Sequence, residues 1–229
     1  MKHSDTKLVD DHPWLFMLFG VTGAILLVVI DLATKDADQS LIRESGGIEM
    51  ATALLYGYAA VLWLWTRPGA EWKTSWQIPT VMVMMMGREL DLDKKITSVG
   101  LLKSDLYLTT QAPMMERLLG VIVVAFTVTM AVRLIRINGP TFIRGLRQPT
   151  LWAWATVGSI GFAVVSKSVD GLHRKLLPLG IDITHHTAVE AEFLEEFLEL
   201  GIPLMFMVAI LSSFIVRQIE VRSLQRSYQ

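Results

Sequence analysis

Five long stretches of this 229-residue chain contain no charged residue, and this feature constrains the fold more than any other. Each stretch is 15 or 17 residues long and, with its flanking residues, approaches the roughly 20 residues that a helix needs to cross a bilayer. They are residues 14–30, 50–66, 118–132, 150–166 and 200–216. Because backbone polar groups in lipid must be paired within their own segment, these stretches predict transmembrane helices.

A sixth apolar segment differs from the others because it carries charges. It begins near Trp76, has Pro79 in its first turn, and contains four methionines before it reaches Arg88 and Glu89. Arg88 is expected about halfway along a helix that crosses a hydrocarbon core about 30 Å thick. An ionised pair at that depth is costly and must face protein or water rather than lipid.

Together these segments predict an all-α, polytopic membrane helix bundle that forms one domain over residues 1–229. The expected spans are about 14–34, 48–66, 76–95, 115–133, 150–167 and 188–216. If the segment with Pro79 folds back as a re-entrant hairpin, the number of spans falls to five. The absence of cysteine excludes disulfides and thiolate metal sites. We expect no cleaved signal peptide, because acidic rather than basic residues precede the first span.

The distribution of basic residues predicts the orientation. Residues 133–147 contain four arginines and no acidic residue, and the C-terminal tail is also rich in arginine. By the positive-inside rule, both segments and both termini lie in the cytoplasm. With this orientation, 11 basic residues lie on the cytoplasmic side and 10 on the outer side. Of the 22 acidic residues, 17 lie on the outer side, and these carboxylates weaken the basic residues beside them as topology signals. We therefore expect a multi-pass protein of the inner (plasma) membrane.

With this topology, charged residues from separate spans meet near the periplasmic leaflet. The segment at the start of the last span places four glutamates on one helix face by the i, i+3, i+4, i+7 rule. Four carboxylates within two turns repel one another and need cations or protons to coexist. We expect one binding or proton/ion site. Its predicted residues are Glu49, Arg88, Glu89, Lys167, Asp170, Glu192, Glu195, Glu196 and Glu199.

These residues also have simpler structural interpretations. A glutamate-rich stretch before a span is often a solvated helix face, and Glu49 could favour the start of its helix through the helix dipole. Lys167 and Asp170 could extend outward to the membrane surface from the end of their span. Arg88 and Glu89 could form an ion pair that only fixes helix packing. That pair is the hardest to explain as a surface feature, because one helix carries both groups to depth.

Familiar catalytic and cofactor motifs are absent from the sequence. Haem ligation needs histidines within spans, and all five histidines lie in predicted loops or termini. There is no H-E-x-x-H, P-loop, G-x-S-x-G or G-x-G-x-x-G motif. Glu195–Glu196 is similar to the paired-glutamate motif of CAAX-type membrane proteases, but the following arginine and the downstream histidines of that family are missing, so we do not assign it. We expect no cofactor and no metal site.

Three classes of function remain open. The first is a binding or translocation protein whose site holds an ion, a proton or a polar or lipid headgroup. The second is a membrane-embedded enzyme acting on a lipid or lipid-linked substrate, with a glutamate as general acid or base beside an arginine that holds a phosphate. The third is a non-catalytic subunit of a membrane complex whose charges lock helices together. We favour the first class. As partners we expect membrane lipids and no nucleic acid, and the protein could form a homodimer or belong to a larger membrane complex.

Overall fold

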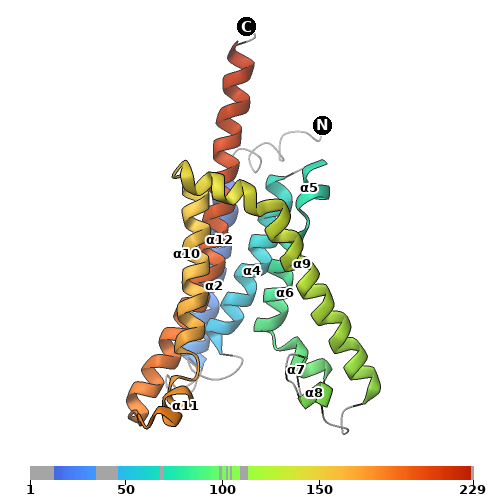
Figure 1. Ribbon diagram of the computed structural model, residues 1–229. Coiled ribbons are helices and arrows are strands. Elements are labelled where there is room, and N and C mark those ends of the chain that lie inside the picture. Colours follow the sequence, from blue (N-terminus) through green and yellow to red (C-terminus); the bar gives the residue numbers. More distant parts are fainter. Residues whose placement is uncertain are drawn as a thin grey trace.

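The computed structural model describes residues 13–34, 46–67, 70–97, 100–101, 103, 105–108 and 113–227. Every element in these ranges is helical, which confirms the predicted all-α class. In chain order they are α2 (Pro13–Thr34), α4 (Gly47–Thr66), α5 (Ala70–Ser75), α6 (Gln77–Glu89), α7 (Leu92–Ile96), α8 (Asp105–Leu108), α9 (Met114–Arg147), α10 (Leu151–Val169), α11 (Leu172–Leu176), the 3-10 helix η1 (Leu177–Leu179) and α12 (His185–Ser227). Helices α2, α4, α12 and α10 pack in that order, and α9 inclines away from them toward one end (Figure 1).

Four helices are long and apolar enough to cross a membrane. They are α2, α4, α9 and the part of α12 up to Ile219. Helices α6 and α10, which occupy the other two predicted spans, do not belong to this group. With 13 residues, α6 is about 20 Å long, which is shorter than a hydrocarbon core. The described helices therefore give a helical bundle with four membrane-spanning candidates, and the six predicted spans are not confirmed.

The third predicted span, residues 76–95, is not one continuous helix. Helix α6 ends at Glu89, and α7 begins at Leu92 after Asp91, whose backbone has a φ of 49°. This left-handed conformation interrupts the helix, and aspartate is one of the few side chains that tolerate it. Arg88 and Glu89 consequently lie in the last turn of α6 rather than in the middle of a helix.

Helices α9 and α12 extend well beyond the spans predicted for them, 115–133 and 188–216. Residues 133–147, which we expected to lie in the cytoplasm between two spans, continue α9 as a helix and bend across the end of the bundle near Pro140 (Figure 1). A proline inside a helix removes one backbone hydrogen bond and commonly causes such a bend. The 43 residues of α12 give it a length of about 65 Å, so its ends extend past a bilayer core.

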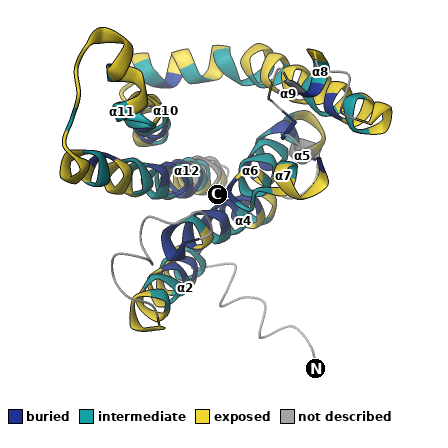
Figure 2. Ribbon diagram, turned by 90° about the horizontal axis from the view of Figure 1, so that it is seen from below, coloured by how far each residue is buried: buried dark blue, intermediate teal, exposed yellow. Residues whose placement is uncertain are grey.

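Helix α4 lies at the centre of the packing. It contacts α2, α6 and α12, and Figure 2 shows it largely buried, whereas α9 is mostly exposed. Ala51 and Ala59 of α4 are fully buried. A Cβ atom added to Gly57 would lie 3.2 Å from the sulfur of Met86 on α6. Small residues that let backbones approach closely are typical of helix contacts in membranes.

Hydrogen bonds fix the arginine-rich end of the bundle. Arg67 Nη2, after the end of α4, donates to Ser213 Oγ of α12 at 2.9 Å. The side chain of Gln77, which is fully buried, donates from Nε2 to Asn138 Oδ1 of α9 at 2.7 Å. Arg133 Nε donates to the other atom of the same amide, Gln77 Oε1, at 3.2 Å. These bonds tie α4 to α12 and α6 to α9.

Candidate functional site

Glu199 of α12 is the centre of the predicted charge cluster. Its side chain is 9% exposed, and its Oε1 atom is approached from two other helices. Arg88 Nη2 of α6 donates to it at 3.2 Å, and Ser166 Oγ of α10 donates at 3.1 Å. Lys167 Nζ, also on α10, lies 3.2 Å from the same oxygen. A buried carboxylate is costly when it is alone, so these groups together make its burial tolerable.

Arg88 joins two buried carboxylates. Its Nη1 atom lies 3.8 Å from Oε1 of Glu89, whose side chain is 4% exposed. The contact with Glu199 is shorter, so the principal partner of Arg88 is on α12 rather than next to it in the sequence. The Arg88 side chain is itself 44% exposed. The guanidinium therefore lies at the boundary between the buried carboxylates and open space.

Lys167 is the second cation of the cluster. Its Nζ atom lies 3.2 Å from Asp170 Oδ2 and 3.5 Å from Glu195 Oε1, in addition to its contact with Glu199. The side chain is 47% exposed, but its ammonium group faces α12 instead of extending outward. Lys167 thus connects the end of α10 to two successive turns of α12.

The glutamates on this face of α12 become more exposed toward the start of the helix. Glu199 is buried, Glu196 and Glu195 are half-buried, and Glu192 is exposed. Glu196 interacts electrostatically with Glu199 and with Glu49, in the first turn of α4. Glu49 also interacts electrostatically with a buried carboxylate of α6. Glu192, in contrast, makes no hydrogen bond or ion pair within the described part of the chain.

Two members of the cluster were not predicted from the sequence. Tyr56 of α4 is fully buried, and its hydroxyl has no hydrogen-bond partner among the described residues. It interacts electrostatically with Glu89, Glu199 and Arg88. A signal existed for this residue, because it follows Glu49 by seven positions and so shares its helix face. Ser166 had no such signal, because its partner Glu199 is 33 residues away.

The cluster contains more acidic groups than basic ones. Its six carboxylates outnumber the three cations described beside them. The cations are Arg88, Lys167 and Lys175, whose Nζ donates to the Lys167 carbonyl at 2.7 Å, and the carboxylates are Glu49, Glu89, Asp170, Glu195, Glu196 and Glu199. The nearby Lys94 is paired with Asp91 at 3.0 Å. Such an excess favours protons or a further cation at the site.

The carboxylates of the cluster do not converge on one point. Within the described ranges, no group of three or more His, Cys, Asp or Glu side chains is placed to hold a metal ion. Four of them, Glu89, Asp170, Glu195 and Glu199, lie instead within 3.8 Å of Arg88 or Lys167.

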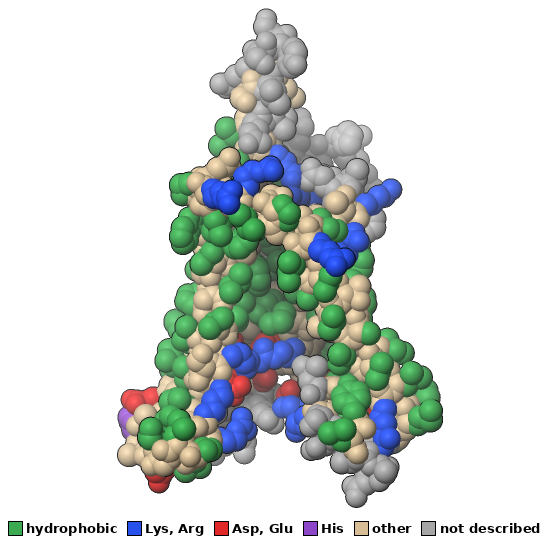
Figure 3. Space-filling model, in the orientation of Figure 1, with side chains coloured by type: hydrophobic (Ala, Val, Ile, Leu, Met, Phe, Trp, Pro, Cys, Tyr) green, Lys and Arg blue, Asp and Glu red, His purple; other side chains and the backbone are tan. Residues whose placement is uncertain are grey.

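The cluster and the arginine-rich end lie at different levels of the bundle. Glu199, in the cluster, and Ser213, bonded to Arg67, are separated by about 21 Å along α12. Figure 3 shows Lys and Arg side chains at the upper end of the molecule, and mixed charges in a hollow between its two lower arms. Hydrophobic side chains cover most of the surface between these two levels (Figure 3).

No known protein family, curated protein or solved structure matches this chain. The geometry of the cluster is therefore the basis on which a function can be proposed. Its main features are two nearly buried carboxylates on α6 and α12, two half-exposed cations that bind them, and the buried hydroxyl of Tyr56.

Proposed function

We propose that the protein is a multi-pass inner-membrane protein that binds and translocates an ion at this cluster, with a proton or a small cation as the species. The observation that carries the proposal is the pair of buried carboxylates, Glu89 and Glu199, bridged by the half-exposed Arg88. Ionisable groups inside membrane segments are expensive, and they commonly mark ion or proton pathways. The excess of carboxylates over cations favours a positively charged guest over an anion.

In this proposal the chain crosses the membrane six times. The α5–α6–α7 segment makes one crossing and α10 another, in addition to the four long helices. Two contacts support these directions. Asp31 Oδ2 at the end of α2 accepts from the Gly47 N–H at the start of α4 at 2.9 Å, so these two helices run in opposite directions. Arg67 at the end of α4 bonds Ser213 in the later part of α12, so α4 and α12 run in the same direction, as the second and sixth crossings must. The arginine-rich end faces the cytoplasm, and the cluster lies toward the periplasmic side.

The hydrogen-bond pattern of α12 is interrupted close to Glu199. Pro203 follows Glu199 by four residues inside α12, and proline has no N–H to donate to the carbonyl of Glu199. In the same turn, Ser159 Oγ of α10 donates to the Ile202 carbonyl at 3.1 Å, one residue before the proline. Interrupted helices next to ion sites are a recurring feature of transporters. The turn around Pro203 is therefore the place where α12 adjusts when the guest binds.

Arg88 contacts both buried carboxylates, and its movement would allow the bound ion to be exchanged. When a proton or cation neutralises Glu199 or Glu89, the attraction between that carboxylate and the guanidinium falls. Arg88 then moves toward its exposed side, and the carboxylate becomes accessible. Loss of the guest reverses this step, because an unpaired buried carboxylate is strongly unfavourable.

The decisive test measures ion flux in proteoliposomes made with purified protein. We expect Arg88→Ala and Glu199→Gln each to abolish flux of protons or monovalent cations, because each removes one partner of the bridge. Glu192→Gln is the matched control, since it makes the same chemical change at an exposed position of the same helix, and it should leave flux unchanged. All three proteins should remain extractable and folded. Unchanged flux in both site variants would rule out the proposal.

The contact between Arg88 and Glu199 also supports a second candidate, a non-catalytic subunit in which the pair only locks α6 to α12. Replacing the pair by neutral side chains, Arg88→Met together with Glu199→Gln, distinguishes the two. A structural lock can be replaced by neutral packing, so assembly and function should persist. A translocation site should fold but remain inactive, because the buried carboxylate on α12 has been lost.

A further inference from the structure

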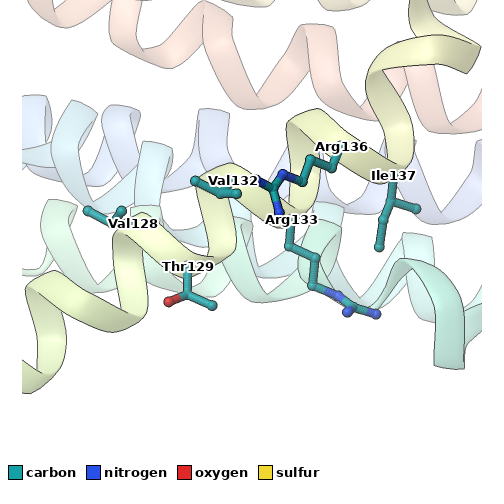
Figure 4. Close-up of a pocket in the computed structure, with 6 residues that line it drawn as sticks. All are labelled: Val128, Thr129, Val132, Arg133, Arg136 and Ile137. Carbon is teal, nitrogen blue, oxygen red and sulfur yellow. The ribbon is translucent and has the colours of Figure 1, made fainter.

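A hollow runs along one side of α9, away from the charge cluster, and its lining changes character along its length. Its volume is ≈ 410 Å³, which falls within the range of small-molecule sites. It is lined by Val128, Thr129, Val132, Arg133, Arg136 and Ile137 (Figure 4). From Val128 to Arg136 the helix rises about 12 Å, and over that distance the lining passes from apolar to cationic. Such a lining suits a ligand that has an apolar part and an anionic group.

The two arginines of the hollow differ in how they are held. Arg133 Nη2 donates to the Thr74 carbonyl at 3.4 Å, Arg133 Nε donates to Gln77, and its guanidinium lies 5.4 Å from the centre of the Trp76 ring. These contacts fix Arg133 against α5 and α6. Arg136 is exposed and makes no hydrogen bond or ion pair with the described residues. Figure 4 shows the two side chains leaving α9 in different directions, so Arg136 is the group available to a ligand.

We propose that this hollow binds an anionic phospholipid, with its phosphate on Arg136 and an acyl chain along Val128 and Val132. A guanidinium suits this role because it offers several N–H donors in a plane that matches phosphate oxygens. No acidic residue lies between Glu116 and Asp170 in the sequence, so neither α9 beyond its first turn nor α10 supplies a competing carboxylate. Fixed by its neighbours, Arg133 adds positive charge to the wall of the hollow.

The surroundings of the hollow favour a lipid over a free anion. Val128 is 56% exposed and Val132 is 41% exposed, and only 11% of the apolar window of α9 is buried. A free phosphate would contact Arg136 and gain nothing from these side chains. A phospholipid gains from both parts, because its chain covers the valines while its headgroup meets the arginine. This site is independent of the proposed ion translocation.

The test is native mass spectrometry of the purified full-length protein in detergent, with added phosphatidylglycerol or phosphatidylcholine. We expect the unmodified protein to retain phosphatidylglycerol in preference to phosphatidylcholine. Arg136→Gln should lower the apparent affinity for phosphatidylglycerol about fivefold, the effect of one basic residue at an anionic lipid surface. Arg147→Gln is the matched control, because it removes the same charge from an exposed position of the same helix outside the hollow, and it should retain the lipid.

A second variant addresses the apolar half of the site. Val132→Trp fills the hollow without changing its charge, and it should lower retention of phosphatidylglycerol as well.

Equal losses in the Arg136 and Arg147 variants would overturn the proposal, because they would show attraction by net charge alone. Displacement of the lipid by millimolar inorganic phosphate would identify a free-anion site instead. Absence of any preference for phosphatidylglycerol in the unmodified protein would show that the hollow is not a lipid site. The Arg136 variant should retain ion flux, so failure of either proposal can be recognised separately.

Discussion

Tyr56 is unusual among the residues of the cluster because its hydroxyl is buried together with its ring. Its ring is fully buried in α4, and its hydroxyl has no hydrogen-bond partner within the described ranges although it interacts electrostatically with Glu89 and Glu199. A buried hydroxyl without a partner costs about 1–3 kcal/mol, and a phenylalanine would fill nearly the same volume without that cost. In the proposed translocation, the hydroxyl is placed to contact the guest or a buried carboxylate beside it.

The substitution Tyr56→Phe tests this role. We expect the free energy of unfolding to stay the same or to rise by about 1 kcal/mol, because an unpaired polar group is removed. Ion flux, in contrast, should fall strongly, since the guest loses a hydrogen-bonding group. Thermal unfolding in detergent and proteoliposome flux measure the two effects separately. Tyr58→Phe is the control, because the Tyr58 ring packs on Phe16 away from the cluster. Normal flux in the Tyr56 variant would mean that the hydroxyl has no part in translocation.

The partner of Arg88 illustrates what sequence reasoning can and cannot find at the residue scale. The sequence showed that a charge within an apolar segment needs a partner inside the protein, and the charged positions of α12 were visible as one helix face. It could not choose among them, because Glu199 is 111 residues from Arg88 and no local spacing rule connects the two. The choice depends on how α12 packs against α4 and α10, which buries Glu199 and leaves Glu192 exposed.

Among the elements, helix positions were easier to predict than helix ends. Helix α2 covers Pro13–Thr34 and α4 covers Gly47–Thr66, close to the apolar runs that predicted them. Hydropathy reports which residues can lie in lipid, but a helix ends where its backbone hydrogen bonds end. Helix α9 therefore continues past its apolar run and past Pro140, while the left-handed backbone at Asp91 ends the helix that carries Arg88 earlier than expected.

The connection between α9 and α10 depends on a glycine at a close contact. Gly145 is buried in the last turn of α9, and an added Cβ atom would overlap the Trp152 ring and lie 3.0 Å from the Ala153 Cβ. We expect Gly145→Ala to lower the free energy of unfolding by about 1–3 kcal/mol, as overpacking usually does.

Gly161 provides the control for that substitution. It is exposed inside the neighbouring helix α10, and an added Cβ atom would meet no other part of the chain within 4 Å. Gly161→Ala should therefore stabilise the protein by about 0.5–1 kcal/mol, because alanine restricts the unfolded chain and favours the helix. Thermal unfolding followed by tryptophan fluorescence compares the two variants. Equal melting temperatures would show that the turn between α9 and α10 adjusts without strain.

Over the whole molecule, charge divides the bundle into two levels. The end with Arg67, Arg136 and Arg147 is basic, and the cluster around Glu199 lies at a level about 21 Å away along α12. Under the proposed orientation the basic end lies in the cytoplasm, as the positive-inside rule favours. In that proposal the guest reaches the cluster from the periplasm.

Cysteine labelling tests this orientation directly, since the chain contains no cysteine that could react in the background. Gln148→Cys introduces a thiol between α9 and α10 at the basic end, and Leu179→Cys introduces one in η1, where Leu179 is 72% exposed. A membrane-impermeant maleimide added to intact spheroplasts should label Leu179→Cys and leave Gln148→Cys unlabelled until the membrane is permeabilised. The opposite pattern would reverse the orientation and place the cluster toward the cytoplasm. Labelling of both positions without permeabilisation would show that α10, which lies between them, does not cross the membrane.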